Sequence, residues 1–217
     1  MEAYLSIKKT GNFKIFIKKS QFICHVKRTN NQKEAEDFIA QVKKENFSAN
    51  HNCFAYVLGM HDEIVKQNDN GEPSGTAGAP ILNVLRQLGL HNVTAVVTRY
   101  FGGIKLGAGG LIRAYSNVTS QTIEHLGMVS MIPQTEIAVS IAYPLQGKLE
   151  HFLETKHILT IATNYTEKVT ITIALESSSC QKTLQTIYDL LNSQVSFKKG
   201  AEVYHEFPYQ KNQKTRY

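Results

Sequence analysis

Residues 99–116 read RYFGGIKLGAGGLIRAYS, and they hold five of the chain's fourteen glycines. Glycine is concentrated where the backbone must adopt a positive φ or approach another group closely. Three basic side chains, Arg99, Lys105 and Arg113, are interleaved with these glycines. Because a strand pattern precedes this stretch and a helical pattern follows it, we expect a glycine loop that leads into a helix N-terminus.

This glycine loop has the chemistry of an anion site. A helix N-terminus presents unpaired N–H groups and the positive end of the helix dipole, and basic side chains beside it can clamp a phosphate. The spacing matches neither the Walker A loop nor GxGxxG, so it predicts no nucleotide class. The alternative is that the glycines only allow close packing while Arg113 pairs with an acid. The candidates for anion or nucleic-acid binding are Arg99, Gly102, Gly103, Lys105, Gly107, Gly109, Gly110 and Arg113.

A second glycine segment, DNGEPSGT at residues 69–76, also precedes a helical pattern. Its carboxylates, Asp69 and Glu72, can bind a cation or act as acid and base. Alternatively, the Asn-Gly pair makes a turn and Ser74 or Thr76 caps the helix. We expect Thr76 to be the cap and leave the role of Glu72 open. The candidates in this second loop are Asp69, Gly71, Glu72, Ser74 and Thr76.

The composition is that of an ordinary globular protein, with 42% hydrophobic and 19% charged residues among 217. The three cysteines are odd in number and far apart, which argues against a disulfide framework or a zinc site. Cys53 lies within an apolar strand pattern and is expected to be a core thiol. Neither a membrane span nor a signal peptide is evident. We therefore expect a cytoplasmic protein without a metal, a cofactor or a membrane partner.

The net charge of +6 is concentrated in the first part of the chain. Residues 1–130 carry 15 Lys and Arg against 10 Asp and Glu, whereas residues 131–217 carry 9 against 8. A basic excess of this kind favours acidic partners such as RNA, DNA or nucleotides.

The apolar periodicity predicts a mixture of strands and helices before residue 128. Alternation indicates strands, and spacing of three and four residues indicates helices. We expect strands at 13–18, 21–27, 52–60, 63–67 and 93–100, and helices at 33–46, 76–88 and 109–126.

Residues 128–134 contain Pro133 and show neither periodicity, so we expect them to form a linker between domains. Beyond them the pattern predicts strand 135–143, helix 144–156, strands 158–163 and 168–176, helix 179–192 and strand 195–206. This βαββαβ order is the ferredoxin-like arrangement. The expected division is a domain over 1–130, a domain over 134–207 and a frayed polar tail over 208–217.

Three motifs resemble the YigZ/IMPACT family in its bacterial two-domain branch. They are HNCFAY at 51–56, NGEPSGTAG at 70–78 and VTRYFGGIKLG at 97–107. One departure is that the family often has Asp-Asp-Gly-Glu-Pro, whereas Asn70 holds the second acidic position here. This departure weakens any mechanism, including a metal site, that requires two adjacent carboxylates.

The resemblance implies an α+β protein of two domains. The first is expected to have a β3α ribosomal-protein-domain-2-like fold, similar to domain IV of elongation factor G, and the second to be similar to domain V of that factor. Eukaryotic relatives in the family are linked to translational control under stress. Our leading hypothesis is a non-enzymatic nucleic-acid- or ribosome-associated protein that regulates translation. The alternatives are a hydrolase of a small anionic or peptide substrate, using Asp69, Glu72 and His51, and a protein-interaction module.

Overall fold

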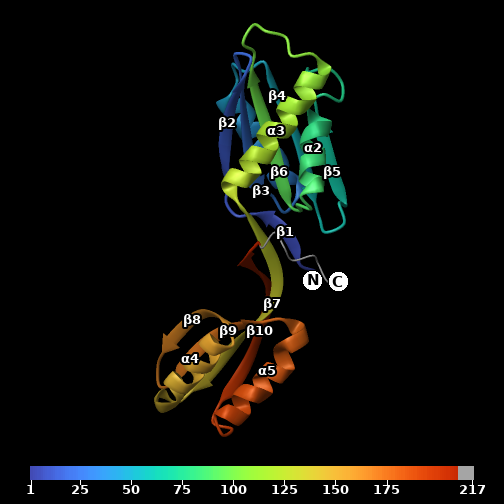
Figure 1. The fold of residues 1–217 in the computed structure, drawn as a ribbon. Coiled ribbons are helices and arrows are strands. Elements are labelled where there is room, and N and C mark those ends of the chain that lie inside the picture. Colours follow the sequence, from blue (N-terminus) through green and yellow to red (C-terminus); the bar gives the residue numbers. More distant parts are fainter. Residues whose placement is uncertain (210–217) are drawn as a thin grey trace. The chain divides into compact units, whose positions relative to one another are not determined.

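A computed structural model describes residues 1–209 of the chain, and its elements divide between two compact units. The larger unit contains Tyr4–Met131, and the smaller contains Met1–Ala3 and Ile132–Glu206. Each unit combines strands with helices (Figure 1), which confirms the two-domain α+β fold expected from the sequence. The polar tail expected over 208–217 lies, from residue 210 on, outside the described residues.

The larger domain is built on a five-stranded antiparallel sheet in the order β2-β3-β6-β4-β5. Both faces of its central strands are covered, so these strands are almost wholly buried and read as continuous apolar runs rather than as an alternation. The strands are β2 (Gly11–Ile17), β3 (Ser20–Arg28), β4 (His51–Leu58), β5 (Ile64–Asn68) and β6 (Val93–Tyr100).

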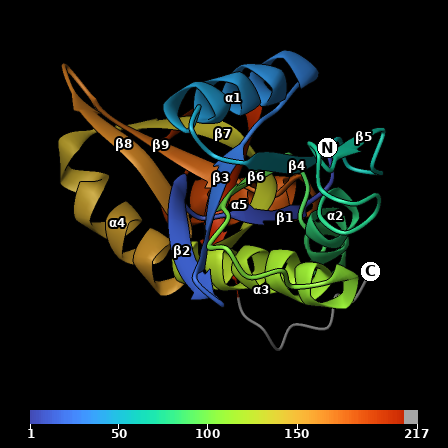
Figure 2. The same ribbon diagram turned by 90° about the horizontal axis from the view of Figure 1, so that it is seen from above.

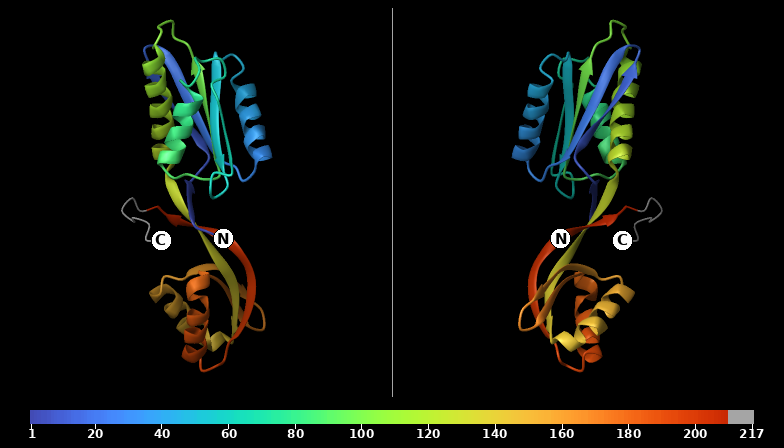
Figure 3. Two further views of the ribbon diagram at one scale, coloured as in Figure 1. Left: turned by 90° about the vertical axis from the view of Figure 1, so that its right-hand side faces the viewer. Right: turned by 90° about the vertical axis from the view of Figure 1, so that its left-hand side faces the viewer.

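Helices cover this sheet on both faces, as Figures 2 and 3 show. On one face α2 (Gly78–Gln87) and α3 (Ala108–Leu126) form the main apolar core with the inward side chains of the strands. On the other face α1 (Gln32–Glu45) packs on β4 and β6 and forms a second, smaller apolar cluster. Large apolar side chains are thus buried on both sides of the central strands, and this fixes the positions of the loops at the strand ends.

One end of the larger domain gathers the segments that the sequence singled out (Figure 1). We call it the loop end and define it as the β2–β3 turn at Lys18 and Lys19 together with residues 46–50, 69–77 and 101–113, the last of which include the start of α3. The strand registers bring these segments together, because Ile17 pairs with Ser20 at the turn and His51 pairs with Arg99. Both glycine segments lie at this end.

The division between the two units falls between Met131 and Ile132, within the linker expected at 128–134, but this segment is not irregular, because it belongs to the strand β7 (Met128–Ile141). The first part of β7 pairs with β1 (Tyr4–Ile7), and the part from Thr135 on pairs with β9. Pro133 falls between these two paired stretches, where a missing N–H breaks no bond to β1 or β9. Pro133 therefore interrupts the sequence pattern without ending the strand.

The smaller domain has the strand order β8-β9-β7-β10, with β7–β9 and β9–β8 antiparallel. Together with the chain order βαββαβ this is the ferredoxin-like arrangement, as expected. Apolar side chains from both helices pack with those of the strands in one core. The elements after β7 are a short 3₁₀ turn (Tyr143–Leu145), α4 (Gln146–Thr155), β8 (Leu159–Tyr165), β9 (Val169–Leu175), α5 (Ser177–Leu190) and β10 (Ser196–Pro208).

Candidate functional site

Arg99 does not lie on the surface as an anion ligand, contrary to the expectation from sequence. The side chain is buried, with the residue only 5% exposed, and its Nη1 donates to Glu72 Oε1 at 2.7 Å. The cause is the strand register: Arg99 pairs with Phe22, and both side chains point towards the main core. Because the buried Glu72 carboxylate already neutralises the Arg99 charge, Arg99 is not placed to bind a phosphate.

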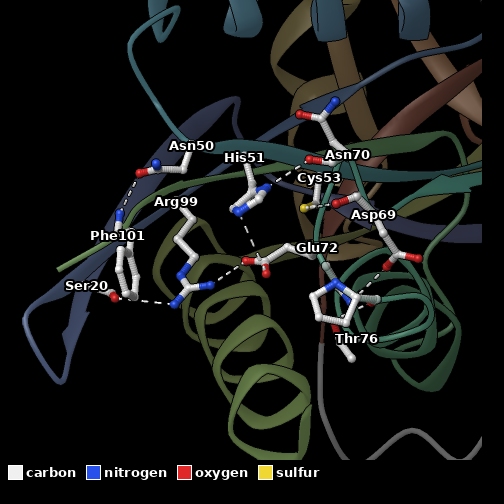
Figure 4. A network of polar contacts seen from close by, with 12 residues as sticks. Ser20, Asn50, His51, Cys53, Asp69, Asn70, Glu72, Thr76, Arg99 and Phe101 are labelled. Carbon is white, nitrogen blue, oxygen red and sulfur yellow. Dashed lines mark hydrogen bonds and ion pairs between the residues drawn. The ribbon is translucent and has the colours of Figure 1, made fainter. Parts of the chain in front are cut away.

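Glu72, whose role the sequence left open, is the centre of a buried polar network (Figure 4). Its Oε1 also accepts a hydrogen bond from the Tyr115 hydroxyl at 2.9 Å, and His51 Nε2 lies 3.9 Å from Oε2. Burial, together with the neighbouring Cys53 and Glu72, raises the pKa of Tyr115 above its usual range. The hydroxyl therefore stays protonated and remains a donor to the carboxylate. Through Glu72 the network joins the 69–77 segment to β6 and α3.

Cys53 is a core thiol, as expected. It is fully buried, and its S–H donates to the Asp69 carbonyl oxygen at 2.9 Å. Burial raises the pKa of the Cys53 thiol to about 12, so the thiolate that a nucleophile requires is not formed near neutral pH.

Thr76 does not cap α2, which begins at Gly78 and has no side-chain cap at Ala77. Thr76 instead donates its hydroxyl to the Pro73 carbonyl, and the cap is Asp69, whose carboxylate accepts from the N–H groups of Gly75, Ala77 and Gly78. Burial opposes ionisation of Asp69, but these three hydrogen bonds outweigh it and lower the pKa of the carboxyl. Asp69 thus orders the whole segment, a role usually taken by a residue next to the helix.

The remaining candidates of the 69–77 segment have structural or solvent-facing positions. Gly71 has φ +86° and lies against the ring of His51, whose Nδ1 is 3.0 Å from the Asn70 carbonyl oxygen. Ser74 is exposed. The Asn-Gly turn expected from the sequence is therefore present, and it holds His51 beside Glu72.

The glycine loop is anchored at its first two residues and open beyond them. Phe101 N–H donates to Asn50 Oδ1 at 2.8 Å, and Gly102 N–H donates to Ser20 Oγ at 3.2 Å. The Arg99 guanidinium lies 5.3 and 5.5 Å from the ring centres of Phe22 and Phe101. Arg99 thus lies between Glu72 and the base of the loop at Phe101 (Figure 4).

Gly102 allows the loop to approach the β2–β3 turn. A Cβ atom there would overlap backbone atoms of Lys19 and Ser20, which cannot move away as a side-chain end can. Gly103 and Gly107 have φ of +83° and +72° and face open space, as does Gly109. Gly107 is the N-cap of α3 and supplies no side-chain cap, so the first N–H groups of this helix face the loop end.

Four exposed basic side chains lie on this loop, on the helix that follows it and on the turn beside it. Lys105 and Arg113, which the sequence singled out, are joined by Lys18 and Lys19 of the β2–β3 turn. None of the four forms an ion pair with another of the described residues. The sequence reasoning missed the two turn lysines, because only the register of β3 on β6 shows that their turn lies beside Gly102.

Within residues 1–209 no group of three or more His, Cys, Asp or Glu side chains is placed to hold a metal ion. None of the described helices is both long and apolar enough to cross a membrane.

Comparison with known proteins gives two family matches. Residues 18–123 match the Impact N-terminal domain, and residues 139–194 match a family described as Domain of unknown function (DUF1949). A crystal structure of a hypothetical protein matches with a TM-score of 0.60 and 31% identity, covering 91% of this chain and 97% of that one.

Curated relatives come from bacteria and eukaryotes. IMPACT family member YvyE of Bacillus subtilis is 42% identical over 206 residues, which are 95% of each chain. IMPACT family member YigZ of Escherichia coli is 36% identical over 75% of this chain and 80% of its own length. Protein IMPACT-B of Xenopus tropicalis is 31% identical over 42% of this chain and 29% of its own length.

Proposed function

The chain belongs to the IMPACT family, and from this premise we propose that it is a non-enzymatic protein that associates with RNA or the ribosome and regulates translation. One observation carries the proposal: four exposed cations and the open N-terminus of α3 share the loop end of the larger domain. Relatives named IMPACT in eukaryotes support the link to translation that the family resemblance implies.

The loop end supplies the parts that phosphate recognition requires. Lys18, Lys19, Lys105 and Arg113 provide exposed positive charge, and the first N–H groups of α3 point in the direction that favours an anion. Arg99 contributes indirectly, because its pairing with Glu72 and its stacking on Phe101 hold the base of the loop. Such contacts attract RNA without reading its sequence.

The hydrolase alternative has less support from the geometry. The Asp69 carboxylate already accepts three backbone N–H groups, and that of Glu72 is occupied by Arg99 and Tyr115. Glu72 is buried, whereas His51 and Asp69 are partly exposed. If the chain were such a hydrolase, Asp69→Asn and Glu72→Gln would abolish turnover, whereas we expect both variants to keep the salt dependence of RNA binding once their folding is verified.

We predict that RNA binding by the full chain weakens steeply with salt and that the loop end carries this dependence. Four phosphate contacts give a slope of log affinity against log salt of about −3 to −4. Fluorescence anisotropy with a structured RNA hairpin over a salt series measures this slope. The test variant replaces all four cations with alanine: Lys18→Ala, Lys19→Ala, Lys105→Ala and Arg113→Ala.

A control variant makes the same change in net charge away from the loop end, with Lys8→Ala, Lys9→Ala, Lys33→Ala and Arg86→Ala. The control should keep a slope close to that of the wild type, and the test variant should lose most of it. Equal slopes in the two variants would mean that only net charge matters, and the loop end would then not be the binding site.

A further inference from the structure

We propose that the side of β2 and β3 that carries Lys14 and Phe16 binds unpaired nucleotides of RNA, with a base stacked on the Phe16 ring. This inference rests on the proposed function, because it specifies the kind of RNA that the loop end takes. It assigns a role to a surface that the glycine segments do not include.

The strand register defines this surface. Lys14 pairs with Ile23 and Phe16 with Gln21, so these four side chains share one side of the β2–β3 hairpin. We call them the hairpin face. It is the side of the sheet on which α1 lies, but α1 packs on β4 and β6. The next residues of β2, Ile15 and Ile17, point to the opposite side and pack against the main core.

Phe16 has no structural role that accounts for a large apolar ring. It is 66% exposed and belongs to none of the three apolar clusters formed by the described residues. The Nζ of Lys14 lies 6.0 Å from the centre of the Phe16 ring. An open aromatic face beside a cation is the arrangement on which an unpaired base stacks while its phosphate is neutralised.

The charge of the hairpin favours a polyanion over a protein partner of mixed charge. Residues 11–28 contain five Lys and Arg and no Asp or Glu. Lys14 precedes Phe16 by two residues on β2, and Lys18 follows it by two in the β2–β3 turn, so a cation lies on each side of Phe16 along the chain. The turn that carries Lys18 and Lys19 adjoins the glycine loop at Gly102, which makes the hairpin face continuous with the loop end.

A single strand fits this surface better than a duplex does. Bases in an RNA duplex are stacked on one another, so they cannot offer a face to Phe16, whereas unpaired bases can. Stacking of bases on aromatic side chains is tolerant of sequence. Phosphate contacts at the loop end are available to both forms, so the aromatic ring is what should distinguish them.

The test compares a 12-nucleotide oligoadenylate with an RNA duplex of about the same charge, each bound to the full chain. We expect Phe16→Leu to weaken oligoadenylate binding about tenfold, as the loss of one base–aromatic stack would. Duplex affinity should stay within about twofold and the salt slope should not change, because no cation is removed. Phe16→Tyr keeps an aromatic ring and should bind oligoadenylate with about the affinity of the wild type. Tyr188→Leu, which removes a 40% exposed ring from α5, is the matched control and should have no effect.

A second readout uses the absence of tryptophan from the chain. Phe16→Trp introduces one indole, whose fluorescence should be quenched by oligoadenylate and not by the duplex. The inference is overturned if Phe16→Leu leaves oligoadenylate binding unchanged, if both RNAs lose affinity equally, or if the wild type does not bind oligoadenylate. A wild type that binds RNA with the expected salt slope but ignores Phe16→Leu refutes this inference and leaves the proposed function standing.

Discussion

Replacing Glu72 with alanine is expected to destabilise the larger domain by about 3–5 kcal/mol, the usual cost of removing one partner of a buried ion pair. The change would leave the Arg99 charge buried without its carboxylate, and it would remove the acceptor of the Tyr115 hydroxyl. Hydrogen exchange of the β6 amides measures the effect, because these amides report on the core of this domain.

Two comparisons make the Glu72 result interpretable. Glu36→Ala breaks an exposed pair with Lys66 at 3.4 Å and should have a much smaller effect. The double variant Glu72→Gln with Arg99→Met removes both buried charges and should recover part of the loss. If Glu72→Ala were no more harmful than Glu36→Ala, the network would not hold the loop end together.

Gly102→Ala is expected to destabilise the larger domain by about 2–3 kcal/mol, within the range for steric overpacking. The added methyl overlaps the backbone of Lys19 and Ser20, so the glycine loop or the β2–β3 turn must shift. This shift separates Lys105 from the turn lysines. RNA affinity should therefore fall severalfold although the net charge is unchanged.

Gly109→Ala is the control for the overlap at Gly102. A Cβ at Gly109 meets open space in the first turn of α3, so the variant should be neutral or more stable by up to about 1 kcal/mol. The midpoints of thermal unfolding of Gly102→Ala and Gly109→Ala measure this difference in stability. Equal midpoints would show that the close approach at Gly102 is not required.

The sequence predicts the fold well where the signal is local. Alternation in β2 and β3, helical spacing in α1 and the βαββαβ order of the smaller domain follow from neighbouring residues. The irregular conformation expected at 128–134 is wrong, because β7 forms by pairing with the distant β1 and β9. Periodicity within seven residues contains no information about such partners.

The site is less predictable because its interactions join residues far apart in the sequence. Arg99 beside glycines has the pattern of an anion ligand, and only the fold shows that Glu72, 27 residues earlier, neutralises it. Asp69 caps α2 from nine residues before Gly78, which is much farther along the chain than the three residues that a capping box spans. The turn lysines likewise become part of the loop end through the register of β3 on β6.

Co-sedimentation of the full chain with purified ribosomes is the most direct test of the claim that the loop end binds RNA. Between about 50 and 200 mM salt, four phosphate contacts should reduce the affinity of the wild type about 50- to 150-fold. The variant that replaces Lys18, Lys19, Lys105 and Arg113 should bind weakly at the lower salt and change little, whereas the control at Lys8, Lys9, Lys33 and Arg86 should behave like the wild type. Binding of the four-cation variant that matches the wild type at both salt concentrations would contradict the account.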